Sequence, residues 1–411
     1  MEILGDFLVS DGLRTASAAN SSPVQEMGSM RPEAMRILDD YRNQTVLALE
    51  HAKKDGVKVV GTYCGFAPNE LILAAGAIPV GLCGTRQEPI AAAEKILPRN
   101  LCPLIKSSFG FSITDTCPFF RLADFIIAET TCDGKKKMFE LLSHYKPMHV
   151  MHLPPGADRA SARRTWLAEV HLLKGVLERF CDVSITDAKL WKHIRVLNQL
   201  RATLQELQEL NKVQPIPLGG VDMLTAMLPL FFPADPNYGI AALRQLIDEI
   251  KGKPLTKLSP FAADAPRILL TGCPVSLGSD KVVKLIEECG GSIVCFEMCT
   301  SYRGFVPVTE DKSKDPIEAI TDRYLEIPCA CMSPNPGRVT LLSELIEEYR
   351  VDGVIDITWH TCHTFAVEDA VLQAENERAW HLPFLHIETD YSDSDVEQLR
   401  TRIAAFLEMI R

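Results

Sequence analysis

One pattern recurs along this chain and constrains its fold: an apolar segment of strand length that ends near a cysteine and is followed by a helix. In the plainest copy, Asp124–Ala128 is an apolar strand and a polar turn carries Cys132. The apolar residues between 138 and 142 then lie on one side of a helix. The pattern recurs at Cys64, Cys273 and Cys362, and in a further segment that ends at Cys299. If the strands are parallel, their ends point the same way and the thiols collect at one edge.

The length of the chain indicates more than one domain. A chain of 411 residues is too long for one small core and suits two α/β domains with helical additions. We predict an N-terminal helical arm over 1–55, a first α/β domain over 56–160, a helical segment with a linker over 161–262, and a second α/β domain over 263–411. Within the arm, residues 1–30 show no clear period and are expected to be loose, whereas 31–54 reads as one helix.

Composition excludes several classes of protein. A net charge of −11 argues against nucleic-acid binding, which needs clustered Lys and Arg to neutralise phosphates. The lysines at 135–137 are a local patch, which we interpret as a solvated helix start. No apolar run of membrane-spanning length and no signal-peptide pattern occurs, so we expect a cytoplasmic protein without a membrane partner. Thirteen cysteines in a reducing compartment are then core residues or metal ligands rather than disulfides.

The spacing of the cysteines bears on the metal that they could bind. Cysteines at 102, 117 and 132 fall in the first predicted domain and those at 273, 331 and 362 in the second, which suggests a site closed at the domain interface. Structural zinc is typically held by paired Cys-x-x-Cys motifs, and the chain contains none. Scattered single cysteines favour an iron–sulfur cluster. Zinc and buried structural thiols remain the alternatives.

Four segments carry a resemblance to a known family: Gly61–Glu70, Leu97–Ser108, Glu129–Lys137 and Ile387–Tyr391. They resemble the 2-hydroxyacyl-CoA dehydratase/benzoyl-CoA reductase family, and within it most closely the double-cubane cluster proteins, over roughly residues 55–411. The resemblance implies two Rossmann-like domains with parallel sheets and an iron–sulfur cluster at their interface. It also implies a separate ATP-hydrolysing iron–sulfur activator protein that supplies single electrons.

The resemblance further implies a set of ligands. Cys102, Cys132 and Cys362 match the three ligands of a single [4Fe–4S] cubane. The additional thiols that a second cubane would require are Cys64, Cys117, Cys273 and Cys331. Two cubanes bridged by sulfide, the [8Fe–9S] arrangement, need six ligands, so seven candidates compete for six places and Cys329 could replace Cys331. Alternatively, the spare thiols only pack near one cubane.

The leading functional hypothesis is a reductase that uses the double cubane on small unsaturated substrates after ATP-driven electron injection, and we expect a homodimer. The chain has no Gly-x-x-x-x-Gly-Lys-Ser/Thr motif, so another protein must hydrolyse the ATP. One alternative is an (R)-2-hydroxyacyl-CoA dehydratase subunit with one [4Fe–4S] cluster, which would need a different second subunit and a CoA pocket. Another is a non-catalytic metal-binding scaffold.

Protons must accompany the electrons to the substrate. His363 and Glu129 are the candidate catalytic residues, with Asp133 and His360 as further options. Each has a simpler interpretation, because His363 could only cap the helix that follows and Glu129 could pair with Lys106.

Overall fold

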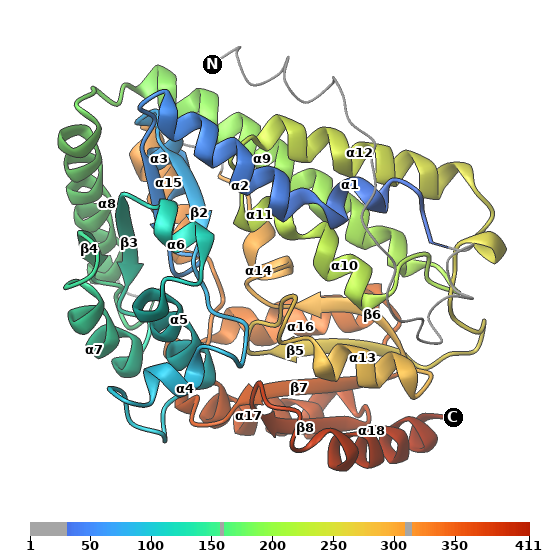
Figure 1. The fold of residues 1–411 in the computed structure, drawn as a ribbon. Coiled ribbons are helices and arrows are strands. Elements are labelled where there is room, and N and C mark those ends of the chain that lie inside the picture. The colour runs from blue at the N-terminus through green and yellow to red at the C-terminus, as the bar shows by residue number, and fades with distance from the viewer. Residues whose placement is uncertain (1–30, 157–159, 309–314) are drawn as a thin grey trace.

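Two separate four-stranded parallel sheets, surrounded by helices, form the framework of the protein (Figure 1). The computed structural model describes residues 31–156, 160–308 and 315–411. The first sheet has the strand order β2-β1-β3-β4, with β1 at Val59–Thr62, β2 at Ile78–Gly81, β3 at Phe125–Glu129 and β4 at Met148–Met151. The second has the order β6-β5-β7-β8, with β5 at Arg267–Gly272, β6 at Ser292–Glu297, β7 at Gly353–Trp359 and β8 at Phe384–Thr389. The predicted α/β class with two parallel, Rossmann-like sheets is confirmed.

Both sheets have the same topology. Each begins with a central strand, adds an edge strand on one side, and then places its third strand on the other side of the first. This reversal leaves a crevice at the carboxyl ends of the two central strands, where open α/β sheets bind ligands. Cys64 and Cys132 follow β1 and β3, and Cys273 and Cys362 follow β5 and β7. In each sheet, therefore, two cysteines lie just after the two central strands, where the strand order reverses.

Helices that begin at cysteines or prolines flank the first sheet. They are α3 (Asn69–Ala74), α4 (Ile90–Ala93), α5 (Pro103–Thr114), α6 (Pro118–Leu122) and α7 (Asp133–Leu142). The segment expected to form one helix over 31–54 is divided at Asp40 into α1 (Met35–Asp39) and α2 (Tyr41–Lys54). Asp40 is the N-cap residue of α2, and its carboxylate accepts hydrogen bonds from the side-chain amides of Asn43 and Gln44. The predicted loose arm, 1–30, lies outside the described residues.

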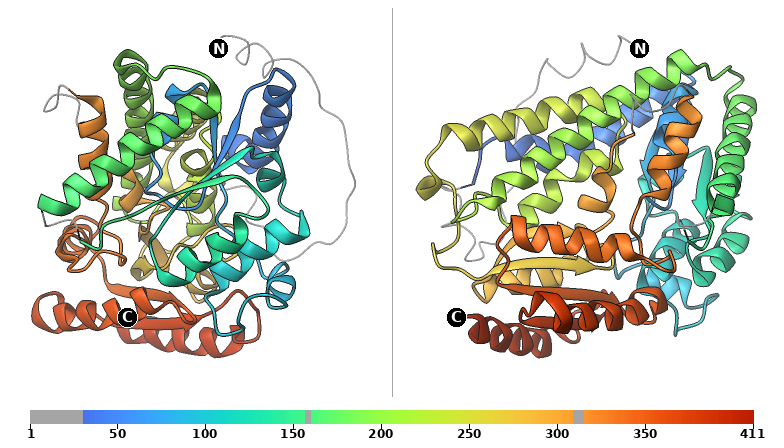
Figure 2. Two further views of the ribbon diagram at one scale, coloured as in Figure 1. Left: turned by 90° about the vertical axis from the view of Figure 1, so that its left-hand side faces the viewer. Right: turned by 180° about the vertical axis from the view of Figure 1, so that it is seen from behind.

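Long helices connect the two sheets. The connection comprises α8 (Ala160–Cys181), α9 (Asp187–Glu209), α10 (Gly220–Ala226), α11 (Leu228–Phe231) and α12 (Pro236–Gly252), with short 3₁₀ turns at Leu210–Lys212 and Leu255–Lys257. Figure 1 shows α9 and α12 side by side above both sheets, and the reverse view in Figure 2 agrees. None of the helices in the described ranges is long and apolar enough to cross a membrane.

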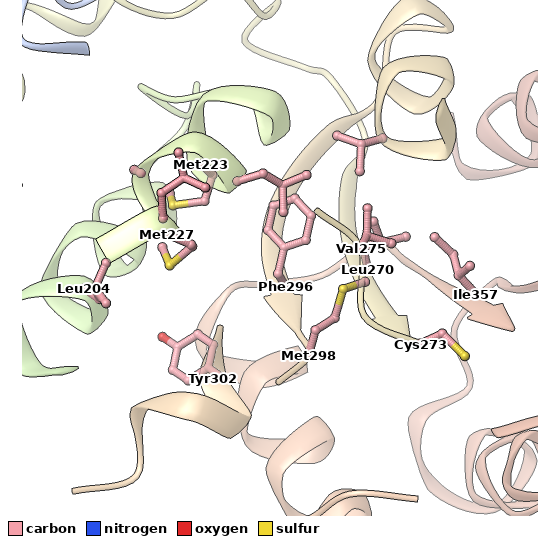
Figure 3. Close-up of a cluster of buried hydrophobic side chains, with 14 of the residues drawn as sticks. Leu204, Met223, Met227, Leu270, Cys273, Val275, Phe296, Met298, Tyr302 and Ile357 are labelled. Carbon is pink, nitrogen blue, oxygen red and sulfur yellow. The ribbon is translucent and has the colours of Figure 1, made fainter. Parts of the chain in front are cut away.

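The second sheet is covered mainly by its own crossover helices. These are α13 (Lys281–Glu288), α14 (Tyr302–Phe305), α16 (Pro336–Glu348), α17 (His363–Glu375), a π-helical turn at Asn376–Trp380, and α18 (Val396–Ile410), whereas α15 (Pro316–Leu325) packs elsewhere. One cluster of buried side chains joins Met223 of α10 and Met227, which directly follows that helix, to Leu270 and Phe296 of the sheet and ends at Cys273 (Figure 3). The hydrophobic core of the second sheet thus extends to a candidate ligand.

Helix α15 leaves the second half of the chain and packs against the first sheet. It contacts α8, and Figure 1 shows it beside α3. Tyr324 of α15 and Ile327 share a buried core with Val60 of β1 and Trp166 of α8. The segment after α15, which carries Cys329 and Cys331, therefore lies against the first sheet although the sequence places it between β6 and β7. The domain boundaries given above remain a prediction.

A buried ionic network involves all four strands of the second sheet. Arg338 of α16, almost fully buried, pairs with Glu297 of β6 and Asp356 of β7, and donates to Thr271 of β5. On β8, the Nδ1 atom of His386 lies 3.1 Å from both Asp356 Oδ2 and Asp369 Oδ1. Hydrogen bonds to the two carboxylates raise the pKa of His386 to about 10. The imidazolium form therefore balances charge that the sheet buries.

The network makes stability depend on pH. The pKa of His386 is higher in the folded than in the unfolded chain, so its contribution is complete below about pH 6.5 and is lost as the pH rises through 10. We expect His386→Asn to lower the free energy of unfolding by roughly 2–3 kcal/mol at pH 6 and by much less at pH 10. Urea unfolding of both proteins at several pH values measures this. His144→Asn, at an exposed position, is the control, and a difference that does not shrink with rising pH would contradict the assignment.

Candidate metal centre

Three thiols from both halves of the chain meet in a first group, Cys102, Cys273 and Cys362. Cys102 and Cys362 are the N-cap residues of α5 and α17, and Cys273 directly follows β5. The Cys362 sulfur makes hydrogen bonds with both other thiols, and these lower its pKa. The hydrogen bond to Cys362 raises the pKa of Cys102. Burial and the hydrogen bond to Cys362 together raise the pKa of Cys273. We call this set the first thiol group.

The backbone before Cys273 is shaped to hold its thiol in place. Gly272 has φ +110°, and a Cβ atom there would lie 2.1 Å from the carbonyl oxygen of Ile357, so only glycine fits. The Cys273 amide donates to that same oxygen at 2.7 Å, and the Cys273 sulfur accepts from the amide of Trp359 at 3.4 Å. Figure 3 shows Cys273 beside Ile357 at the edge of the apolar cluster.

A second group of thiols gathers where the segment after α15 meets the first sheet. Cys329 and Cys331 are in hydrogen-bonding contact, which lowers the pKa of Cys329 and raises that of Cys331. Cys64, two residues after β1, is close enough to both for their charges to interact, and burial raises its own pKa. Cys64, Cys329 and Cys331 form the second thiol group.

Lys135 corrects one sequence prediction. It was expected on a solvated helix start, yet it is 8% exposed, whereas Lys136 and Lys137 are exposed. Its Nζ donates to the carbonyl of Tyr63 at 3.2 Å. Burial alone would lower the pKa of Lys135. The negative charges of the surrounding groups outweigh burial and raise this pKa; the groups are Cys64, Cys83, Glu129 and Cys132. Helical periodicity could have revealed this, since Lys135 precedes Met138, Phe139 and Leu142 by three, four and seven residues.

The remaining candidate ligands lie near these groups or apart from them. Cys132 is the N-cap of α7, and its sulfur accepts from the backbone amide of Lys135 at 3.4 Å, which places it beside that lysine. Cys117 is the N-cap of α6, and its sulfur accepts from the amide of Phe120 at 3.5 Å. Within the described ranges we find no contact between the Cys117 thiol and either thiol group. Cys299, which was not among the candidates, is half-buried and close enough to Cys329 for their charges to interact.

The candidate proton donors differ in burial. Glu129 is fully buried, neither carboxylate oxygen has a hydrogen-bond partner, and burial raises its pKa to about 8. The suggested pairing with Lys106 is wrong, because Lys106 binds Glu94 at 2.8 Å. His363, the first residue of α17, is exposed, as are Asp133 and His360. The catalytic roles of His363 and Glu129 remain predictions.

A cavity of about 160 Å³ adjoins the second thiol group through Cys64 and reaches chain segments that carry members of the first. Cys64, Cys83, Cys299 and Lys135 contribute to its wall. Leu104 and Pro274 also line the cavity. They follow Cys102 and Cys273 of the first thiol group by two residues and one residue. A small molecule in this cavity would contact the Cys64 thiol and the segments that follow Cys102 and Cys273.

Two parallel sheets with thiols gathered between them define a class of α/β proteins suited to a metal cluster, and comparison with known proteins names the family. The model of the family "2-hydroxyglutaryl-CoA dehydratase, D-component" matches residues 64–410. The chain belongs to this family, as the resemblance implied.

Individual relatives agree with the family. The chain is 42% identical, over 90% of its length and 96% of the relative, to the Escherichia coli (strain K12) protein named "Putative dehydratase subunit YjiM". It is 23% identical to the "(R)-phenyllactyl-CoA dehydratase beta subunit" of Clostridium sporogenes, over 90% of this chain and 97% of the relative. With one of the benzoyl-CoA reductase subunits of Thauera aromatica it shares 24% identity over 96% of this chain and 97% of the relative.

The first thiol group can be tested by cross-linking the metal-free protein. Thiols in hydrogen-bonding contact are close enough to oxidise to a disulfide after small movements. We expect diamide to link Cys362 to Cys102 or Cys273, which peptide mass mapping under non-reducing conditions would detect. Cys181 and Cys289, which belong to neither group, should stay reduced and serve as controls. A Cys362 that remains reduced, or that pairs at random, would contradict the arrangement.

Proposed function

We propose that this protein is the iron–sulfur reductase component of an ATP-dependent system and that it holds an [8Fe–9S] double-cubane cluster. One observation carries the proposal: thiols from both halves of the chain meet in two groups, and a cavity that Cys64 lines extends to residues near the first group. Single cysteines that become neighbours only in the folded chain suit an iron–sulfur cluster, whereas structural zinc sites are typically built from paired motifs.

The residues present fit such a cluster in number and chemistry. Cys102, Cys273 and Cys362 would hold one cubane. Cys64 and Cys331 would hold the other, with Cys132 or Cys329 as the third ligand. Cys117 is the candidate left over. Buried cations are available to balance thiolate charge, since Lys135 is surrounded by thiols and the charges of Cys329 and Cys299 act on the fully buried Arg303.

When bound, the cluster would supply low-potential electrons to a small unsaturated substrate. The chain itself contributes the cavity that Cys64 and Cys83 line. In its wall, the Lys135 ammonium favours negative charge near Cys64. Glu129, buried beside Lys135 and without a hydrogen-bond partner, is suited to deliver a proton, and the exposed His363 is suited to exchange protons with solvent.

The proposal includes partners. The chain has no phosphate-binding loop for ATP, so a separate ATP-hydrolysing iron–sulfur activator must supply the electrons. The net charge of −11 favours an activator with a basic docking surface. We further propose a homodimer that works in the cytoplasm.

A second candidate function is a dehydratase subunit with a single [4Fe–4S] cluster. The names of the relatives favour it, since one is a beta subunit of an (R)-phenyllactyl-CoA dehydratase and another is named a dehydratase subunit. In that case Cys102, Cys132 and Cys362 would be the ligands, and Cys273 would be a packing residue. The two candidates therefore differ in the role of Cys273.

Metal analysis of anaerobically purified protein separates the candidates. About eight irons per chain with a similar amount of acid-labile sulfide favours the double cubane, about four favours the single cubane, and zinc without iron favours a scaffold. We expect Cys273→Ser to lower the iron content to roughly half or less, while the control Cys181→Ser leaves it unchanged. Four irons per chain that survive in Cys273→Ser would support the dehydratase subunit, and an iron-free native protein would refute both cluster proposals.

A further inference from the structure

The wall of the cavity beside the thiols is strongly cationic. Arg42, Lys135, Arg201 and Arg323 all contribute to it, and no aspartate or glutamate in the described part of the chain does. Lys135 belongs to the thiol side, where Cys64 and Glu129 surround it. Arg201 lies on α9 and Arg323 on α15, and α9 contacts both α15 and α3 (Figure 1). We call the part of the cavity that these two arginines line the Arg201–Arg323 end. Charges at this end must be balanced by other groups.

The nearest carboxylate contacts only one of these two arginines. Glu70 of α3 is fully buried, and Arg201 Nη2 donates to it at 2.6 Å. The second carboxylate oxygen of Glu70 accepts from the hydroxyl of Tyr324 at 2.9 Å. Both oxygens of Glu70 therefore have hydrogen-bond partners, and its single negative charge acts on both guanidinium groups although only Arg201 contacts it.

Arg323 has no acidic partner at ion-pair distance within the described ranges. It is 4% exposed, its Nε donates to the carbonyl of Val306 at 2.9 Å, and its Nη2 donates to that of Gly304 at 2.9 Å. Its Nη1 is buried and has no hydrogen-bond partner. Burial and then the charge of Arg201 lower its pKa to about 10, which is the direction expected of a cation without a counter-charge. The two buried guanidinium groups thus share one buried carboxylate, and an anionic ligand would offset the remaining positive charge.

This charge does not serve the proposed cluster. The groups that act most strongly on Arg323 are Arg201, Tyr324, Glu70 and Glu326, and no thiol is among them. The same holds for Arg201, on which Glu70 and Tyr324 act. The buried cations whose pKa is raised by the charges of nearby thiols are Lys135 and Arg303. The two ends of the cavity are therefore separate in their electrostatics.

We propose that the Arg201–Arg323 end of the cavity binds the anionic group of a small carboxylate and that the rest of that ligand extends toward the thiols. The cavity, at about 160 Å³, is below the range of ordinary cofactor pockets and admits a ligand of a few heavy atoms. Asn69, whose Oδ1 has no partner, lines the same end and can contribute its amide to the carboxylate. That the bound carboxylate is also the substrate rests on the reductase function proposed above.

The binding site can be tested without turnover. Crotonate and crotonamide have nearly the same shape and differ in charge. We expect titration calorimetry on the full chain, at constant ionic strength, to show at least tenfold tighter binding of crotonate. Arg323→Gln should weaken crotonate at least tenfold and crotonamide less than twofold. Arg163→Gln is the matched control, because Arg163 pairs with Asp322 beside Arg323 without lining the cavity, and it should change neither affinity by more than twofold.

Several results would overturn the inference. Equal affinities for crotonate and crotonamide, no binding of crotonate at 50 mM, or an unchanged preference in Arg323→Gln would each do so. If Arg323→Gln does not fold, Arg323→Lys keeps the positive charge and should retain the preference for crotonate at lower affinity. Iron analysis of the same samples separates the two proposals. If the protein contains iron but does not prefer crotonate, the reductase proposal stands and the carboxylate site is refuted. If the protein prefers crotonate but contains no iron, the carboxylate site stands and the reductase proposal is refuted.

Discussion

The two halves of this protein depend on each other because neither can assemble a complete thiol group alone. A parallel sheet directs the carboxyl ends of its strands to one edge, and the reversal of strand order opens a crevice between the two central strands. The chain uses this twice, after β1 and β3 and again after β5 and β7. Cys102 then meets Cys273 and Cys362 across the interface, and Cys64 meets Cys329 and Cys331. Separation of the two sheets would divide both groups.

Burial of charge is the second constraint. Parallel sheets are covered on both faces, so polar side chains on their strands must find partners inside the protein. The second sheet solves this with Arg338, Glu297, Asp356 and His386. Near the thiols, Lys135 and Arg303 act as counter-charges. At the Arg201–Arg323 end of the cavity, Arg323 has no ion-pair partner among the described residues. The distribution of paired and unpaired charges therefore separates structural sites from places where a ligand can bind.

Sequence reasoning was most successful where local periodicity dominates. Strand-length apolar segments that end in cysteine–helix turns were placed correctly, and the α/β class followed from their alternation. It was less successful for single polar residues. Lys135 was assigned to solvent because charged runs usually are solvated, yet three-dimensional packing buries it among thiols. Lys106 was matched to Glu129 on charge alone, and the fold gave each a different neighbour.

By itself, the sequence determined most of the strands and helices and the positions of cysteines at strand ends and helix starts, because these depend on residues near each other in the chain. The alternation of strands and helices then predicted the parallel class of the sheets. Only the tertiary structure decided which thiols meet. Helix α15 crosses from the second half to pack on the first sheet, and this carries Cys329, Cys331 and Arg323 to Cys64 and Glu70. Such a crossing depends on the complementarity of apolar surfaces far apart in the chain, and no local pattern of residues encodes it.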